Sequence, residues 1–241
     1  MKKKTQQESP KITLFTIPNI LTLCNLISGS LAVVFTLRYD GLQMAFFMIV
    51  AAAVFDFLDG FSARLFHSNS ILGVQLDSLS DVVSFGVAPS AILLSMFESS
   101  GGVGEIGYGV FLLAAFSALR LAKFNIDDRQ HDHFIGLPTP AAALFVASLG
   151  YMFEAKLFTI HPAVILAIAL GLALLLISEI PMFALKFKHY GFKGNEIRYV
   201  FLAVSLLALL IGGFGAVSGI ILLYILVSLV SWAVCKPSRK A

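Results

Sequence analysis

Residues 42–65 read LQMAFFMIVAAAVFDFLDGFSARL, and residues 72–97 read LGVQLDSLSDVVSFGVAPSAILLSMF. Each run is apolar and exceeds the roughly 20 residues of helix that cross a bilayer. Four aspartates interrupt the two runs: Asp56, Asp59, Asp77 and Asp81. Four carboxylates in an apolar setting repel one another and resist desolvation unless cations neutralise them. The two runs therefore predict a pair of membrane helices with a divalent-metal site between them.

The composition of the whole chain extends this prediction beyond the two runs. Of 241 residues, 58% are hydrophobic and 13% are charged, and the mean hydropathy is +0.90. Such a composition excludes an ordinary soluble domain and predicts an all-α, polytopic helical bundle in a membrane. The two cysteines, Cys24 and Cys235, lie in or at the end of apolar segments, which does not suggest a disulfide framework.

The apolar runs predict about eight transmembrane helices. They fall near residues 17–37, 42–65, 72–97, 105–124, 138–154, 161–185, 198–212 and 216–235. With both termini in the cytoplasm, Arg38 and Lys156 are the two basic residues left outside, out of 17 Lys and Arg. This strong bias is typical of cytoplasmic loops and supports the count of eight.

The predicted spans divide the chain into three parts. Residues 1–16 form a cytoplasmic N-terminal segment that we expect to lie at the membrane interface, uncleaved. Residues 17–190 form a catalytic membrane core of six spans. Residues 191–241 add two C-terminal spans and a short basic tail.

Helical spacing places the acidic residues on two stripes at one depth. Asp56, Asp59, Gly60 and Ala63 follow the spacing i, i+3, i+4, i+7, and Gly73, Asp77 and Asp81 follow i, i+4, i+8. Since one predicted helix ends and the next begins on the cytoplasmic side, the two stripes can face each other there. Oxygen-only ligands favour Mg²⁺, Mn²⁺ or Ca²⁺ over Zn²⁺.

Small residues on the same stripes leave room for a ligand, and Arg64 adds a positive charge suited to phosphate. Metal ligands, small residues and an arginine together indicate phosphoryl transfer on a pyrophosphate substrate.

The pattern Asp56-x-x-Asp59-Gly60-x-x-Ala63-Arg64-x8-Gly73-x3-Asp77-x3-Asp81 resembles the complete signature of the CDP-alcohol phosphotransferase family. The resemblance implies a membrane enzyme that displaces CMP from a CDP-linked substrate with a hydroxyl acceptor. It implies that the four aspartates coordinate two metal ions, Mg²⁺ or Mn²⁺ with Ca²⁺ possible, and that Asp81 is also the base. The residues implied to shape the CDP pocket are Gly60, Ala63, Arg64 and Gly73.

Flanking stretches resemble the bacterial and archaeal phosphatidylserine synthases within this family. They are residues 17–22, 84–89, 119–125 and 136–140. The implied substrates are CDP-diacylglycerol and L-serine, in the cell (inner) membrane, with a site that faces the cytoplasm, a homodimeric assembly and no nucleic acid. The expected contacts are Asn19 and Thr22 with the CDP moiety, and Arg120, Lys123 and Asn125 with serine.

Several alternatives stay open at this point. The acceptor could be glycerol-3-phosphate or inositol phosphate in place of serine. Arg120 and Lys123 could simply anchor a helix end at the headgroups, and Asn19 could simply cap the first span. In a different class, an ion-coupled transporter also carries intramembrane acids, although these usually lie near the midplane.

Overall fold

The computed structural model describes residues 13–66, 70–127, 135–182, 191 and 195–234. Within these ranges the chain is helical, apart from an isolated antiparallel bridge between Ile135 and Pro181, so the all-α prediction is confirmed. The elements are α1 (Ile17–Tyr39), α2 (Leu42–Leu65), α3 (Ile71–Asp81), a π-helical turn (Val82–Val87), α4 (Ala88–Ser99), a 3-10 helix (Glu105–Phe111), α5 (Leu112–Phe124), α6 (Thr139–Glu154), α7 (Pro162–Ile177), α8 (Glu196–Gly212), a short 3-10 turn (Gly213–Gly215) and α9 (Ala216–Val234).

Five described helical runs are long and apolar enough to cross a membrane, and the chain is a multi-pass membrane protein. They are Ile17–Tyr39, Leu42–Leu65, Ile71–Ser99, Glu105–Ile126 and Glu196–Ala233, the last of which joins α8 and α9. Helix α7 is apolar but shorter. Each of the eight predicted ranges contains a helix, whereas the count of eight spans and the side on which the termini lie stay predictions. The predicted N-terminal segment, up to residue 12, and the basic tail lie outside the described residues.

The predicted span 161–185 is wrong at its C-terminal end, because α7 stops at Ile177. Ser178 is extended, with φ −63° and ψ 152°. Ile180 precedes Pro181, and a residue before proline is disfavoured in the helical region. The extended segment instead hydrogen-bonds to the start of the α6 region, where Gly136 N–H donates to the Ile180 carbonyl at 2.9 Å and Leu137 N–H donates to the Leu175 carbonyl at 3.0 Å.

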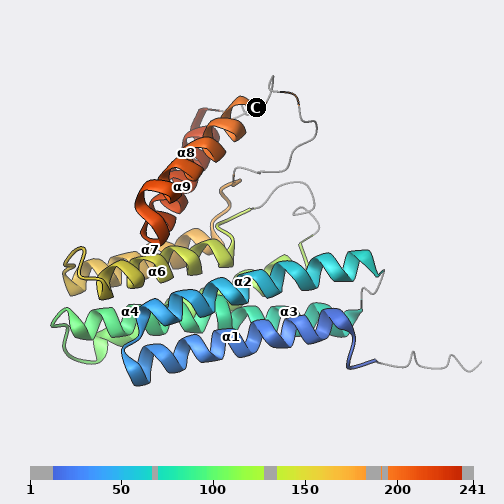
Figure 1. Cartoon of the computed structure of the whole chain (residues 1–241), viewed down its shortest axis with the longest axis horizontal. Helices are drawn as coiled ribbons and strands as arrows, with labels where there is room; N and C mark the ends of the chain where they lie inside the picture. The colour runs from blue at the N-terminus through green and yellow to red at the C-terminus, as the bar shows by residue number, and fades with distance from the viewer. Residues whose placement is uncertain (1–12, 67–69, 128–134, 183–190, 192–194, 235–241) are drawn as a thin grey trace, which may run out of the picture.

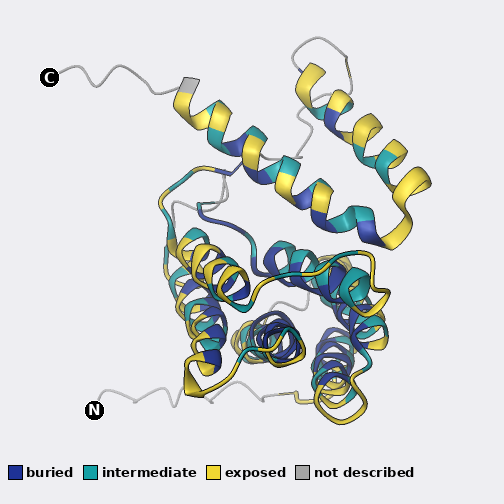
Figure 2. Ribbon diagram, turned by 90° about the vertical axis from the view of Figure 1, so that its left-hand side faces the viewer, coloured by how far each residue is buried: buried dark blue, intermediate teal, exposed yellow. Residues whose placement is uncertain are grey.

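The helices of the core run side by side along the long axis of the molecule (Figure 1). Viewed along that axis, their buried faces point inward and their exposed faces point outward (Figure 2). Helix α1 packs against α2, α3 and the π-helical turn. Its closest approach is at Gly29, where an added Cβ would lie 2.5 Å from the Ser84 Cα, so only glycine lets the two backbones meet.

Helices α8 and α9 form a hairpin that leans away from the core (Figure 1). Its base is tied to α6 through Ser148, whose hydroxyl donates to the Phe214 and Gly215 carbonyls at 2.9 and 3.1 Å and accepts from Ser218 N–H at 3.1 Å. The hairpin is therefore fixed to the core at one end, while most of its apolar surface stays exposed (Figure 2).

Candidate metal and nucleotide site

Three of the four aspartates converge at the end of the bundle where α2 ends and α3 begins (Figure 1). Carboxylate oxygens of Asp56 and Asp59 from α2 and Asp77 from α3 all lie within 4.8 Å of one another. The two predicted stripes therefore do face each other. Three carboxylates this close repel strongly in the absence of a cation.

The site suits a divalent metal ion, which the family resemblance implies. The cluster supplies oxygen donors, the ligands that Mg²⁺ and Mn²⁺ prefer. Asp77 Oδ1 is buried and has no hydrogen-bond partner among the described residues. A buried carboxylate oxygen without a donor is costly, and a cation would satisfy it.

A cavity of about 190 Å³ lies beside this cluster. Its lining comes from α1, α2 and α3, with Ser70 just before α3: Pro18, Asn19, Thr22, Asp59, Gly60, Ala63, Ser70, Gly73, Val74 and Asp77. The structure thus brings five of the six residues that we expected to contact CDP to one cavity. The exception is Arg64, which is exposed and is not part of this lining.

The two glycines of the pocket keep its walls open. A Cβ on Gly60 would meet no other atom within 4 Å, so a side chain there would occupy space that is free for a ligand. A Cβ on Gly73 would lie 3.1 Å from Ser70 Oγ and 3.4 Å from Asn19 Oδ1, both polar atoms of the pocket. Close approach of a ligand to the backbone is a common reason for glycine.

Helix α1 supplies polar partners for this pocket. The Thr22 hydroxyl donates to Asp59 Oδ2. Asn19 is not the cap of α1, because that cap is Thr16, whose hydroxyl accepts from Asn19 N–H at 3.3 Å. The Asn19 side chain instead donates to the Leu14 carbonyl at 2.8 Å, which holds it at the rim of the cavity. The capping alternative for Asn19 is therefore wrong.

Asp81 lies one helical turn beyond Asp77 and outside the group of three acids. It is buried, and its Oδ1 accepts a hydrogen bond of 3.0 Å from Asn25 Nδ2 on α1. It also interacts electrostatically with Asp56 and Asp77, so it belongs to the same charged region. The structure therefore separates a group of three acids from a fourth acid with a partner of its own.

Arg120 reaches the interior from α5. Its side chain is 7% exposed, and Nη1 donates to Thr139 Oγ1 at 3.3 Å. The guanidinium lies over the Phe124 ring, 5.6 Å from its centroid, and interacts electrostatically with Asp81. Its Nε is buried without a partner among the described residues. This burial argues against an arginine that simply anchors a helix end in the headgroups, since such a side chain would snorkel outward.

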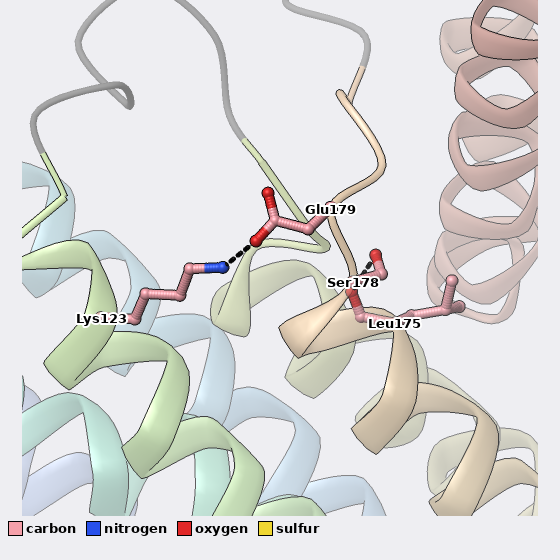
Figure 3. Close-up of polar contacts among 4 residues, drawn as sticks. All are labelled: Lys123, Leu175, Ser178 and Glu179. Atoms are coloured by element: carbon pink, nitrogen blue, oxygen red, sulfur yellow. Dashed lines mark hydrogen bonds and ion pairs between the residues drawn. The ribbon is translucent and has the colours of Figure 1, made fainter.

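Lys123 and Asn125 lie nearer the surface at the same end of α5. Figure 3 shows the Lys123 ammonium pointing to Glu179, with which it forms an ion pair, in the extended segment after α7. The Asn125 side chain donates to Ser78 Oγ at 2.8 Å. The structure does not bring either residue into the cavity lining, and Glu179, which we had expected to make an interhelical or interfacial contact, pairs with Lys123.

The sequence reasoning missed Asn25 and Ser70. Asn25 follows Asn19 and Thr22 at spacing i, i+3, i+6, a polar stripe in an apolar helix, and that spacing was the available signal. Ser70 caps α3 by accepting from Gly73 N–H at 2.9 Å. A serine three residues before Gly73 is a recognisable capping position.

Comparison with known proteins connects this site to a family. The family model described as CDP-alcohol phosphatidyltransferase matches residues 15–177, which include the whole acidic cluster and its cavity. The match ends at the last residue of α7, so the α8–α9 hairpin lies outside it.

Proteins named CDP-diacylglycerol–serine O-phosphatidyltransferase are among the relatives. The one from Methanocaldococcus jannaschii is 38% identical over 199 residues, or 83% of this chain and 85% of that protein. The one from Bacillus subtilis is 33% identical over 178 residues, or 72% and 90%. The one from Helicobacter pylori strain J99 is 41% identical over 136 residues, or 55% and 56%, so the chain spans about half the length of that relative.

Proposed function

The chain belongs to the CDP-alcohol phosphatidyltransferase family, and from this premise we propose that it transfers the phosphatidyl group of CDP-diacylglycerol to L-serine. In this reaction the serine hydroxyl oxygen forms a bond to the phosphatidyl phosphorus. The phosphoanhydride bond to CMP breaks, and CMP leaves with the electron pair of that bond. The proton of the hydroxyl goes to the base.

The observation that carries the proposal is the acid cluster beside the cavity. Asp59, Gly60 and Ala63 on α2 face Gly73 and Asp77 on α3 across a space bordered by the polar side of α1. A pyrophosphate brings negative charge to this wall of carboxylates, which is unfavourable without cations. We therefore assign the metal ions and the CDP moiety to the same space.

Asp56, Asp59 and Asp77, with Asp81, would hold two divalent ions, Mg²⁺ or Mn²⁺. When bound, the ions offset negative charge on the phosphate oxygens and on the departing CMP. Asn19 and Thr22 border the cavity from α1 and offer hydrogen bonds to the nucleotide. Arg64 lies outside the lining and is retained as a nucleotide contact on the family signature alone.

Asp81 is the proposed base for the serine hydroxyl. It is buried and separate from the group of three acids, so one of its oxygens is free to accept a proton. Arg120 interacts electrostatically with Asp81 and has an unpaired Nε, which suits the carboxylate of serine. Lys123 and Asn125 lie further out, and we place them on the entry path of serine, where Glu179 and Ser78 are their present partners.

The setting of the enzyme follows from the same proposal. We place it in the cell (inner) membrane with eight spans, both termini and the acid cluster on the cytoplasmic side, and the N-terminal segment at the interface. CMP and serine then exchange with the cytoplasm while acyl chains remain in lipid. Residues 17–190 form the catalytic core of a homodimer, and residues 191–241 are an addition to it.

The decisive experiment compares acceptors in one assay. Purified protein in mixed micelles with CDP-diacylglycerol and Mn²⁺ or Mg²⁺ receives L-serine, glycerol-3-phosphate or inositol phosphate, and CMP release is measured. We expect release with serine. Release with another acceptor would retain the family and replace the substrate, and ion or solute flux without CMP release would favour a transporter.

A further inference from the structure

Asn25 is a buried amide in the middle of α1, next to the acid that we assign as the base. Its side chain is 0% exposed. Its Nδ2 donates to Asp81 Oδ1 at 3.0 Å, across the interface between α1 and α3. A neutral amide in an apolar helix is expensive to bury, and it is normally retained for a specific hydrogen bond.

The chemistry of the pair fixes the orientation of the amide. An ionised carboxylate oxygen accepts hydrogen bonds and donates none, so the NH₂ group of Asn25 must face Asp81. The other end of the amide, Oδ1, is then turned away and is buried without a partner among the described residues. An amide that served packing alone would not leave its acceptor unpaired. The contact with Asp81 is therefore the purpose of this side chain.

The backbone next to this pair leaves little freedom. Gly29, one turn along α1, lies against Ser84, at a separation that admits no Cβ. The π-helical turn Val82–Val87 begins immediately after Asp81 and is the segment that meets α1 there. π-turns are rare and occur frequently at functional sites. Asn25 and Asp81 are thus held on two backbones in direct contact.

We propose that Asn25 is a positioning residue that holds Asp81 Oδ1 and thereby turns Asp81 Oδ2 toward the acceptor hydroxyl. This inference rests on the proposed function, because it concerns the base of that reaction. Asn25 contacts Asp81 and does not contact the group of three acids. Its loss should therefore slow proton removal without weakening metal binding by the other three carboxylates.

The test replaces Asn25 with leucine, which keeps the number and branching of the side-chain atoms and removes the amide. Asn25→Leu should lower kcat about 10- to 100-fold, the usual effect of removing a partner of an active-site group. KM for CDP-diacylglycerol and for serine should stay within about threefold, and Mn²⁺ binding, followed by electron paramagnetic resonance, should not change. Asn25→Ala guards against overpacking and should lose kcat similarly.

Ser84→Ala is the matched control. It also removes a buried hydrogen bond between the same two elements, from Ser84 Oγ to the Asn25 carbonyl at 3.0 Å, but it does not touch Asp81. We expect it to lower the melting temperature about as much as Asn25→Leu while keeping most of the turnover. Equal losses of kcat in Ser84→Ala and the Asn25 variants, or near-normal kcat in the latter, would overturn the inference. Lack of serine-dependent CMP release by the unaltered protein would instead overturn the proposed function.

Discussion

Two helical runs of this protein show opposite relations between hydrophobicity and burial. The run Ile71–Ser99 carries Asp77 and Asp81, and 72% of its most apolar 18-residue window is buried. The run Glu196–Ala233, which joins α8 and α9, is the more apolar of the two, and 11% of its window is buried. The more apolar run is therefore the one that faces outward.

The difference follows from the solvent. Lipid tails are as apolar as leucine, so a bilayer gives no hydrophobic drive to bury the hairpin side chains. Polar and ionisable groups, in contrast, must face the protein interior. In this chain, the polarity of a helix predicts its place in the core better than its hydrophobicity does. Five changes should break or sharpen this comparison, and we order them from the largest expected effect to the smallest.

Removing the divalent metal should have the largest effect, because it acts on all the carboxylates of the core at once. We expect EDTA to abolish CMP release and added Mn²⁺ or Mg²⁺ to restore it. Zn²⁺ should restore it poorly, since the described cluster offers oxygen ligands alone. Full activity in EDTA would contradict the metal site.

Asp81→Asn should lower kcat about 10²- to 10⁴-fold, because it removes the base that takes the serine proton. Binding of CDP-diacylglycerol should largely remain, as Asp81 is not part of the cavity lining. Asp40→Asn is the control, since Asp40 lies beside Lys156 at the opposite end of the bundle. Unchanged turnover in Asp81→Asn would exclude Asp81 as the base.

Arg120→Ala should raise KM for serine about 10- to 100-fold, the usual worth of a hydrogen bond to a charged group. KM for CDP-diacylglycerol should change much less. Arg38→Ala is a close control, because Arg38 also lies over an aromatic ring, 5.8 Å from the centroid of Tyr39, but at the other end of α1. Parallel changes in both KM values for Arg120→Ala would favour a structural role.

Gly60→Leu should raise KM for CDP-diacylglycerol about tenfold, which matches the cost of overfilling a site. The fold should tolerate it, because nothing lies within 4 Å of the position where the Cβ would be. Gly171→Leu on α7 is the control, as it has the same free space but lies far from the cavity lining. Similar KM values in the two variants would mean that the space at Gly60 is not used by the lipid substrate.

Ile211→Ala on the hairpin should have the smallest effect, with kcat/KM changed less than about twofold and stability by no more than about 0.5 kcal/mol. Ile211 is 86% exposed, whereas Ile92 in the core is 0% exposed. Ile92→Ala should cost about 2–5 kcal/mol. Thermal unfolding in detergent measures both, and equal melting temperatures would contradict the contrast between the two runs.

The sequence predicted most of the fold because helices in lipid are long, apolar and bounded by polar residues. The facing stripes on α2 and α3 followed from helical spacing, and the structure places Asp56, Asp59 and Asp77 together. The end of α7 was not predicted correctly, because the apolar run beyond Ile177 hid an extended segment that is paired with Gly136 and Leu137. Apolar composition alone cannot distinguish a helix from a short paired segment.

Contacts between helices were less accessible to prediction. Asn25 and Asp81 are 56 residues apart, and their hydrogen bond depends on how α1 rotates against α3. The close approach at Gly29 sets that rotation, and single-helix spacing does not reveal it. Lys123 had a partner in Glu179 for the same reason, since the pair joins the end of α5 to a segment that packs beside it only in the folded bundle (Figure 3).

The lengths of the helices have a consequence for the surrounding bilayer. Helix α1 has 23 residues and α7 has 16, which correspond to about 34 Å and about 24 Å at a rise of roughly 1.5 Å per residue. A hydrocarbon layer of about 30 Å fits the first, but it is too thick for the second. Lipids next to α7 must therefore compress or tilt. Membrane thickness thus becomes a property that this protein senses unevenly around its circumference.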